Sequence, residues 1–417
     1  MDHTILIIVV SGLIAIATAW GVGSADLANI LSTSIGSKAI KVSTAIVIAI
    51  IFEFSGAFFG GGHVSHTLQN DIINLAMIHD QQLIIYAMFS ISLAGASWMI
   101  IASAFGLPAS ITNSIVGALV GFGWSVFGAS AINWSKILHI ILSWVISPII
   151  CAFLSYLLFV TIQRLILIRP HPERYVKKYF YPSCFIVGLI LAQMMVFKIL
   201  TALHCNDYLP HKLIILSLTG LLCLFIGFLL NCTQKKITAP LDRHLAFAYV
   251  EKKFSILMAF TACAMVFAHG SNDVPISVAP FSIIVKILYH ESNQHFIHQL
   301  SIYSLAFGGL SVILGLLMYG RKVIQTVGSG ITTLTPSRAF SATIATACVV
   351  IFSTSTGIPI SVTQTLVGGV LGVGLARGLG ALNLTVIRNI FLSWCVTIPA
   401  TSLLSIVYFY LIKYIFY

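Results

Sequence analysis

Long apolar stretches recur along the chain, and short polar stretches separate them. A helix needs roughly 20 apolar residues to cross a bilayer, so the pattern predicts an all-α polytopic membrane protein with about 10–12 transmembrane helices. Pro275 and Pro280 interrupt the stretch after Asp273, and we expect the helix to break there without a full crossing. Twelve candidate spans lie near 4–22, 42–60, 83–103, 104–126, 137–160, 183–201, 212–231, 254–271, 273–290, 299–320, 339–356 and 358–376, and a further apolar stretch covers 385–410.

The composition agrees with this pattern. The chain has 417 residues, of which 58% are hydrophobic and 8% charged, whereas a soluble domain has about 25% charged residues. The net charge of +11 does not predict a nucleic-acid partner, because no basic run is interleaved with aromatic residues. The basic residues instead follow the positive-inside rule. With both termini outside, most of them fall on the cytoplasmic side; the exceptions are Lys136, Lys198, Lys212, Lys286 and Lys413.

One segment with glycine, proline and hydroxyl residues occurs twice. Residues 106–117 read GLPASITNSIVG, and residues 357–368 read GIPISVTQTLVG. A Gly-x-Pro break within the bilayer frees backbone N–H and C=O groups, which then need hydrogen-bond partners from protein or from a water-filled cavity. Paired interruptions of this kind mark the substrate site of many transporters. We therefore expect paired broken helices or re-entrant hairpins within two repeats.

The repeats are predicted to have inverted topology. With an odd number of crossings in the first half and a two-helix hairpin after it, the second half inserts into the membrane with the opposite orientation. The predicted organisation is an N-terminal transmembrane repeat (1–160), cytoplasmic connectors with a central two-helix hairpin (161–253), and a C-terminal inverted repeat (254–417).

The repeated segments are candidate anion sites. A helix that begins at such a break directs its N–H groups and the positive end of its dipole toward an anion, and hydroxyls add further donors. The alternative is that the hydroxyls bond back to the preceding turn; the second copy favours the anion site. The candidate residues are Ser110, Thr112, Asn113, Ser114, Ser361, Thr363, Gln364 and Thr365. The glycine pairs Gly117/Gly121 and Gly368/Gly372 that follow are predicted to allow close helix packing.

A second repeated motif contains one carboxylate in each half. Residues 23–29 read GSADLAN, and residues 270–276 read GSNDVPI. A carboxylate at membrane depth is costly and indicates a functional site. Together with carbonyls freed by unwinding at the glycine, it would suit a hard monovalent cation or a proton, although Asp26 could instead be an interfacial helix cap. The candidate cation-coupling residues are Asp26, Asn29, Asn272, Asp273 and Glu53.

Glu53 lies in the middle of a span without a Lys or Arg partner in its half. It could bind a cation, carry a proton or form a hydrogen bond across helices. No arginine is expected at depth, so a carried anion would depend on co-bound cations, which predicts cation symport. Lys286 is the one basic residue expected near the second motif, and we expect it to snorkel to an interface. His63, His66 and His79 are predicted to lie in a solvated loop.

These motifs resemble the inorganic phosphate transporter (PiT) family over nearly the whole chain. Its G-A-N-D-V-A-N-A motif is similar to 270–274 and, more weakly, to 23–29, and its G-L-P-V-S-T-T-H-S/T segment is similar to 106–114 and 357–365. Further similar stretches are FEF at 52–54 with GGHV at 61–64, and LGVGLARG at 371–378. The resemblance implies symport of phosphate with Na⁺ or H⁺, a homodimer, an inverted-repeat core, and two hairpin tips that face the substrate. We expect no cofactor and no metal beyond a transported Na⁺ at Asp26 and Asp273. The expected location is a bacterial cytoplasmic (inner) membrane.

The chain departs from the family pattern at four positions. Ala25 and Ile276 replace asparagines, and Asn113 and Gln364 replace the histidine of the two segments. The alternative function is therefore a sulfate or neutral metal–phosphate carrier of the same fold. An enzyme is not expected, because the chain contains neither G-x-S-x-G nor H-E-x-x-H. The duplicated broken helices argue against a channel.

Overall fold

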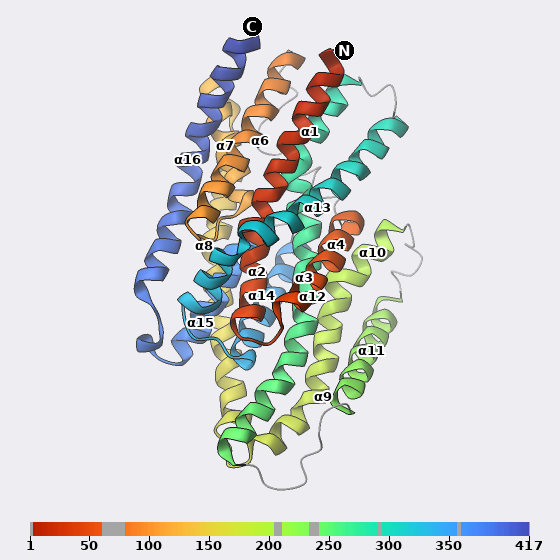
Figure 1. Ribbon diagram of the computed structural model, residues 1–417, viewed down its shortest axis with the longest axis vertical. Helices are drawn as coiled ribbons and strands as arrows, with labels where there is room; N and C mark the ends of the chain where they lie inside the picture. The colour runs from red at the N-terminus through yellow and green to blue at the C-terminus, as the bar shows by residue number, and fades with distance from the viewer. Residues whose placement is uncertain are drawn as a thin grey trace.

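The computed structural model describes residues 3–60, 80–203, 211–232, 242–289, 294–356 and 360–416. These residues form an elongated bundle of helices with no strand among them, and both ends of the chain lie at the same end of the bundle (Figure 1). The helices are α1 (His3–Val22), α2 (Ala28–Gly36), α3 (Val42–Ile48), α4 (Phe54–Gly60), α6 (Gln81–Ala104), α7 (Ile111–Phe127), α8 (Trp134–Ile162), α9 (Pro172–Leu191), α10 (Phe197–Ala202), α11 (Lys212–Cys232), α12 (Arg243–Leu288), α13 (Gln294–Gln325), α14 (Pro336–Thr356), α15 (Val362–Ala376) and α16 (Leu384–Phe416).

Ten helical stretches of the described chain are long and apolar enough to cross a bilayer. The prediction of an all-α, multi-pass membrane protein is thereby confirmed. Large apolar side chains cover the outside of the bundle, as expected where lipid is the solvent; on α11, for example, Leu213 is 79% exposed. Two further apolar helices, α7 and α15, are shorter than a span.

Several spans contain a π-helical turn. The turn η1 (Gly23–Leu27) joins α1 to α2, so that one continuous helix runs from Thr4 to Gly36. The turn η2 (Ala49–Glu53) likewise joins α3 to α4. Single π-helical turns often occur at functional sites, and these two contain the acidic residues Asp26 and Glu53.

The two copies of the repeated segment begin short helices. In the first copy, α6 ends, Gly106 adopts a φ of +70°, and α7 starts after Ser110. A positive φ favours glycine, and Pro108 cannot continue α6, so the chain turns back on itself. Residues 104–126 and 358–376 were therefore wrongly expected to be full spans, since α7 and α15 are the short second arms of hairpins with α6 and α14.

The helix α12 is continuous over 46 residues. The expectation of a break after Asp273, and of two spans at 254–271 and 273–290, was wrong. Pro275 and Pro280 both lie within the helix. The two prolines remove the donors of the Ser271 and Ile276 carbonyl oxygens, and in membrane helices neighbouring helices and side chains compensate for such losses.

The glycine pairs pack as predicted, and they join opposite halves of the chain. α7 lies against α16, where a side chain at Gly121 would overlap the backbone of Ser402. α15 lies against α8, where a side chain at Gly368 would overlap the backbone of Pro148. The succession of hairpin, 3₁₀ turn and long helix thus occurs twice, and each long helix supports the hairpin of the other half.

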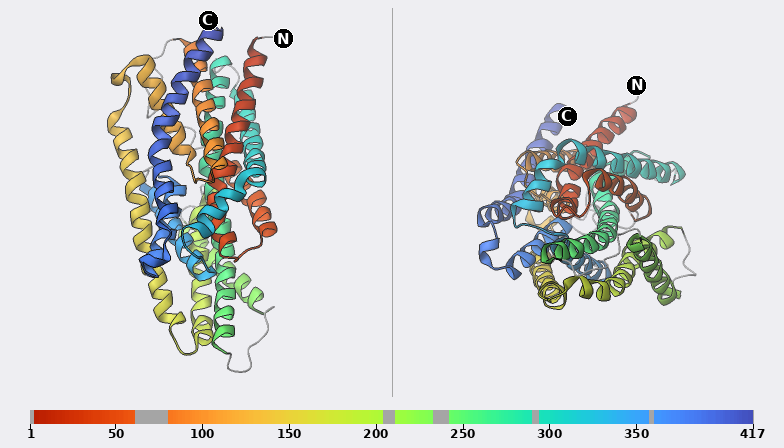
Figure 2. Two further views of the ribbon diagram at one scale, coloured as in Figure 1. Left: turned by 60° about the vertical axis from the view of Figure 1, so that its left-hand side comes forward. Right: turned by 60° about the horizontal axis from the view of Figure 1, so that its bottom comes forward.

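The central hairpin lies on one side of the bundle. α9 continues through the π-helical turn η6 (Ala192–Val196) into α10, and α11 packs against α9 (Figure 2). α9 also packs against α12, and α10 packs against α4. The hairpin is therefore in contact with α12, which contains the second acidic motif, and with α4, the helix that follows Glu53.

Candidate functional site

Asp26 joins the two repeated segments. One of its carboxylate oxygens, Oδ2, accepts a hydrogen bond from the backbone N–H of Ile111, the first residue of α7, at 2.8 Å. The other, Oδ1, accepts from the hydroxyl of Thr363 in the first turn of α15. Asp26 is 1% exposed. The N-termini of the two short helices therefore meet at one buried carboxylate, as expected for anion-binding helix ends.

The two aspartates of the repeated motif also lie together. Ligand atoms of Asp26, His269 and Asp273 lie within 4.8 Å of one another. We had expected an unwound backbone at each glycine, and this was wrong, because both motifs are helical. Gly23 and Gly270 instead allow close approach: a side chain at Gly23 would overlap the backbone of Val312, and one at Gly270 would overlap that of Glu53.

Glu53 and His269 form a fully buried pair. His269 Nδ1 lies 2.7 Å from Glu53 Oε1, and both side chains are 0% exposed. His269 Nε2 lies 3.3 Å from Asp273 Oδ2, one helical turn further along α12. Of the three roles considered for Glu53, the contact across helices is the one that the geometry shows. The imidazole therefore lies between Glu53 and Asp273, with a hydrogen bond to Glu53 and a close approach to the Asp273 carboxylate.

Several buried oxygen atoms near these side chains accept no hydrogen bond from the described residues. They are Asn29 Oδ1, Glu53 Oε2, Asn113 Oδ1 and Gln364 Oε1. Asn29 reaches the second repeated segment through its other amide atom, since Nδ2 donates to the carbonyl oxygen of Thr363 at 3.2 Å. Orphaned buried polar atoms are uncommon. Carboxylate and amide oxygens are ligands that hard cations prefer.

The predicted hydroxyls divide into two groups. Ser114 Oγ donates to the carbonyl oxygen of Ser110 at 2.8 Å, and Thr365 Oγ1 donates to that of Ser361 at 2.7 Å. These two follow the alternative of bonding back to the preceding turn. Ser110 and Ser361 are the N-cap residues of α7 and α15, where Ser361 Oγ accepts from the N–H of Gln364 and Ser110 makes no side-chain cap bond.

The remaining hydroxyl of the first copy, Thr112, is buried together with its neighbour Asn113. Asn272 differs from the other predicted residues because it is half-buried and its Oδ1 accepts from Lys198 Nζ at 3.3 Å. The same ammonium donates to Ser271 Oγ at 2.6 Å. We had expected Lys286 to be the one basic residue near the second motif, and this was wrong, because Lys198 contacts the motif. Lys286 itself is exposed. His63, His66 and His79 lie outside the described residues.

Sequence reasoning missed His269 and Lys198. For His269 a signal was present, because it directly precedes the second motif and lies four residues, about one helical turn, before Asp273. For Lys198 there was none, because it contacts Ser271 from 73 residues away in the chain.

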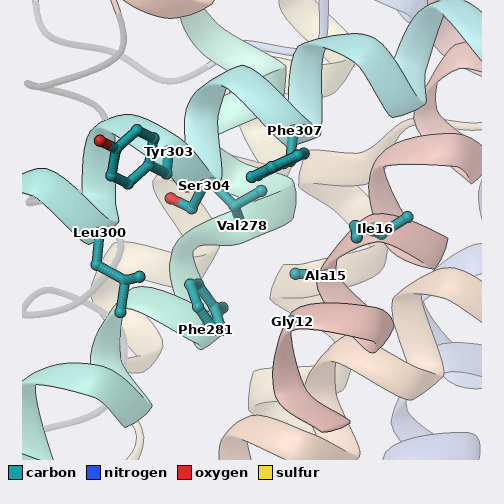
Figure 3. A pocket seen from close by; sticks show the side chains of 10 residues that line it. Gly12, Ala15, Ile16, Val278, Phe281, Leu300, Tyr303, Ser304 and Phe307 are labelled. Atoms are coloured by element: carbon teal, nitrogen blue, oxygen red, sulfur yellow. The ribbon is translucent and has the colours of Figure 1, made fainter. Parts of the chain in front are cut away.

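A pocket elsewhere in the bundle does not match this chemistry. It lies between α1, α12 and α13 and is lined almost entirely by apolar side chains, including Ile16, Val278, Phe281 and Phe307 (Figure 3). Ile16 precedes Asp26 by ten residues, roughly 15 Å along a helix. An apolar pocket provides few donors to an oxyanion, so the polar cluster around Asp26 is the candidate site.

The cluster combines groups that suit both an anion and cations. Helix N-termini and hydroxyls are donors for an oxyanion. Three buried carboxylates and unpaired amide oxygens favour positive ligands, because a buried charge without compensation is costly. The cluster can therefore hold an anion only together with positive charge.

Known proteins resemble this chain over nearly its whole length. The sequence profile described as "Phosphate transporter family" matches residues 22–405. A protein of Haemophilus influenzae with the provisional name phosphate permease is 41% identical over 404 residues, which cover 95% of this chain and 94% of that protein. The chloroplastic inorganic phosphate transporter 2-1 of Arabidopsis thaliana is 35% identical over 416 residues, which cover 94% of this chain and 69% of that protein.

The fold also has a counterpart among solved structures. A structure titled "The sodium-dependent phosphate transporter" aligns with a TM-score of 0.83 and 30% sequence identity, covering 98% of this chain and 100% of that chain.

Proposed function

The chain belongs to the phosphate transporter family, and from this premise we propose that it is a secondary active transporter that moves inorganic phosphate together with a coupling cation. It is a transporter and not an enzyme, as are the relatives that it matches. Phosphate transport follows from the family. The coupling, the alternating-access mechanism and the residue roles below are our proposal.

The meeting of both repeated segments at Asp26 is the observation that carries the proposal. Ile111 of α7 and Thr363 of α15 donate to the same carboxylate. We propose that phosphate binds beside these helix ends, with Ser110, Thr112, Asn113 and Ser114 from one segment. From the other segment, the proposed residues are Ser361, Thr363, Gln364 and Thr365. Because Asp26 shares its donors with the anion site, phosphate binding would be coupled to the charge on Asp26.

The proposed cation residues are Asp26, Asn29, Glu53, Asn272 and Asp273. Phosphate adds negative charge to a cluster that already contains buried carboxylates, so a co-bound cation is needed to compensate both. The unpaired oxygens of Asn29 and Glu53 supply ligands suited to Na⁺. The structural neighbour's title names sodium dependence, which favours Na⁺ over H⁺. The imidazole of His269 would give H⁺ coupling a path, and H⁺ stays the alternative.

Alternating access is the mechanism that we propose. One hairpin from each half reaches the cluster, so a movement of each hairpin together with the long helix that supports it would expose the cluster to one side of the membrane and then to the other. The proposal keeps the organisation into two inverted repeats, 1–160 and 254–417, with 161–253 between them. It also includes a homodimer in a bacterial cytoplasmic membrane, which rests on the family resemblance and the bacterial relatives.

A sulfate or neutral metal–phosphate carrier is the second candidate. Asn113 and Gln364 stand where the family has histidine, and both are buried in the cluster. An amide stays neutral, whereas an imidazole can be protonated, so the two residue types present different charges to an oxyanion. The choice of anion therefore has to be measured.

The test is uptake of radiolabelled phosphate into proteoliposomes of the purified protein. A Na⁺ gradient and a pH gradient are imposed separately, and sulfate is added as a competitor. We expect phosphate accumulation driven by the Na⁺ gradient and little competition by sulfate. Accumulation driven by the pH gradient alone would identify H⁺ as the coupling ion. Uptake that neither gradient accelerates would refute symport, and equal competition by sulfate would favour the second candidate.

A further inference from the structure

Lys198 brings a fixed positive charge to the second acidic motif from outside both repeats. It lies on α10, at the end of the first arm of the central hairpin. Its ammonium donates to Ser271 Oγ at 2.6 Å and to Asn272 Oδ1 at 3.3 Å. Asp273 is the next residue of the motif, so the ammonium lies close enough for its charge to act on the Asp273 carboxylate. The contact therefore joins the hairpin to the candidate cation site.

The first acidic motif has a different arrangement at the matching positions. Ser24 corresponds to Ser271, and its hydroxyl pairs with the hydroxyl of Ser103 at 2.6 Å. Ala25 corresponds to Asn272 and is completely buried. Among the described hydrogen bonds and ion pairs, no Lys or Arg side chain contacts residues 23–29. One aspartate of the pair thus has an ammonium beside its motif, and the other does not.

An ammonium and a sodium ion can compensate the same buried carboxylate. Both supply one positive charge, but only the sodium ion crosses the membrane with the substrate. A tethered ammonium next to Asp273 removes part of the electrostatic reason to bind a free cation there. Its partners are a hydroxyl and an amide oxygen, the same ligand types that a hard cation uses.

We propose that Lys198 is a tethered cation of the transport site, which occupies the place of one coupling cation beside Asp273. On this proposal, the protein moves one cation fewer per phosphate than the same chain would with a neutral side chain at position 198. Asn272 is then a ligand of the Lys198 ammonium, and Asp26 is the main site for the free cation. This inference rests on the proposed cation-coupled phosphate transport.

The test measures the charge moved per phosphate in wild type and in Lys198→Met, which has a similar length and no charge. Proteoliposomes with fixed phosphate and cation gradients are clamped at a series of membrane potentials with K⁺ and valinomycin. The potential at which net phosphate flux reverses gives the coupling ratio, whichever cation is used. We expect the ratio to rise by one positive charge per phosphate in Lys198→Met. A purely structural role would change the rate of transport but not this ratio.

Two control variants accompany the measurement. Lys198→Arg keeps the charge and should show the wild-type ratio. Lys286→Met removes an exposed lysine from α12, 13 residues after Asp273, and should also show the wild-type ratio. An unchanged ratio in Lys198→Met would overturn the inference while leaving the proposed function intact. A wild-type protein without cation-driven phosphate flux would overturn both.

A second measurement decides the case in which Lys198→Met reaches the membrane but transports nothing. The number of coupling ions bound per purified protein is compared between wild type and Lys198→Met, with radioactive sodium, or by proton release in weak buffer if coupling is to H⁺. One additional ion in the variant supports the inference. An equal number overturns it.

Discussion

At the scale of single residues, the two matching aspartates have different partners. Asp26 accepts from the ends of both short helices, whereas Asp273 faces His269 and lies next to the contact of Asn272 with Lys198. Both lie in one cluster with His269. Their charges therefore act on the same ligands, although their surroundings differ.

Neutralising Asp273 should stop transport without unfolding the protein. Asp273→Asn keeps the shape of the side chain and removes its charge, so we expect phosphate uptake to fall nearly to zero while abundance in the membrane stays at the wild-type level. Asp80→Asn is the matched control: Asp80 is an exposed N-cap of α6, and asparagine caps equally well. Uptake by Asp273→Asn at the wild-type rate would remove its proposed coupling role.

The two N-cap serines should separate binding from stability. Both Ser110→Ala and Ser361→Ala are expected to weaken the apparent affinity for phosphate, because each removes a hydroxyl from the proposed site. Only Ser361 caps its helix through its side chain, so only Ser361→Ala should also lower stability, by about 1 kcal/mol. Saturation curves of uptake and thermal unfolding in detergent measure the two effects. Unchanged saturation in both variants would count against hydroxyl coordination.

The buried Glu53–His269 pair should show strong coupling in a double-mutant cycle. Removing one partner of a buried charged pair leaves the other uncompensated, which typically costs about 3–5 kcal/mol. Glu53→Ala and His269→Ala should therefore each lower thermal stability, and the double variant should lose much less than the sum of both. Additive losses would show that the two side chains do not depend on each other.

These residues also show how far sequence reasoning reached. The glycine-proline repeat and the two acidic motifs are visible as local patterns, because a polar group in an apolar span is costly and therefore conspicuous. The contact of Lys198 with Ser271 depends on where the central hairpin packs, which no local pattern encodes. The wrong expectation of unwound glycines has a similar cause: glycine permits both unwinding and close packing, and only the neighbouring helix decides.

At the scale of elements, hydropathy located the helices better than their ends. It cannot distinguish a span from the short arm of a hairpin, so α7 and α15 were counted as spans. The helix-breaking effect of proline was also overestimated, since α12 continues through Pro275 and Pro280. In both cases the outcome depends on partners for freed backbone groups, which come from other elements.

Close packing of the hairpin helices should be intolerant of a single methyl group. A side chain at Gly121 would overlap the backbone of Ser402 in α16, and one at Gly368 that of Pro148 in α8. We expect Gly121→Ala and Gly368→Ala to lower thermal stability and uptake, because backbone cannot move aside as a side chain can. Gly380→Ala is the control, because nothing lies within 4 Å of an added methyl group there. Wild-type melting of Gly121→Ala would contradict the observed packing.

At the scale of the whole molecule, the two halves are interlocked. α8 of the first half supports α15 of the second, and α16 of the second supports α7 of the first. Residues 1–160 and 254–417 therefore cannot move as two separate rigid bodies without breaking these contacts. The unit that moves in alternating access would have to combine helices from both halves, for example a hairpin with the long helix that supports it.

The orientation of the molecule follows from its charges. The chain ends lie together at the end of the bundle opposite the start of α9 (Figure 1), and the first two turns of α9 contain Arg174 and Lys177. Because basic loops stay in the cytoplasm, the C-terminus is expected outside. Alkaline phosphatase fused after Tyr417 should be active and green fluorescent protein dark at the same place. The same reporters fused after Pro170 are the control and should give the opposite result. Bright fluorescence after Tyr417 would reverse the predicted orientation, and with it the side from which the hairpin tips first receive phosphate.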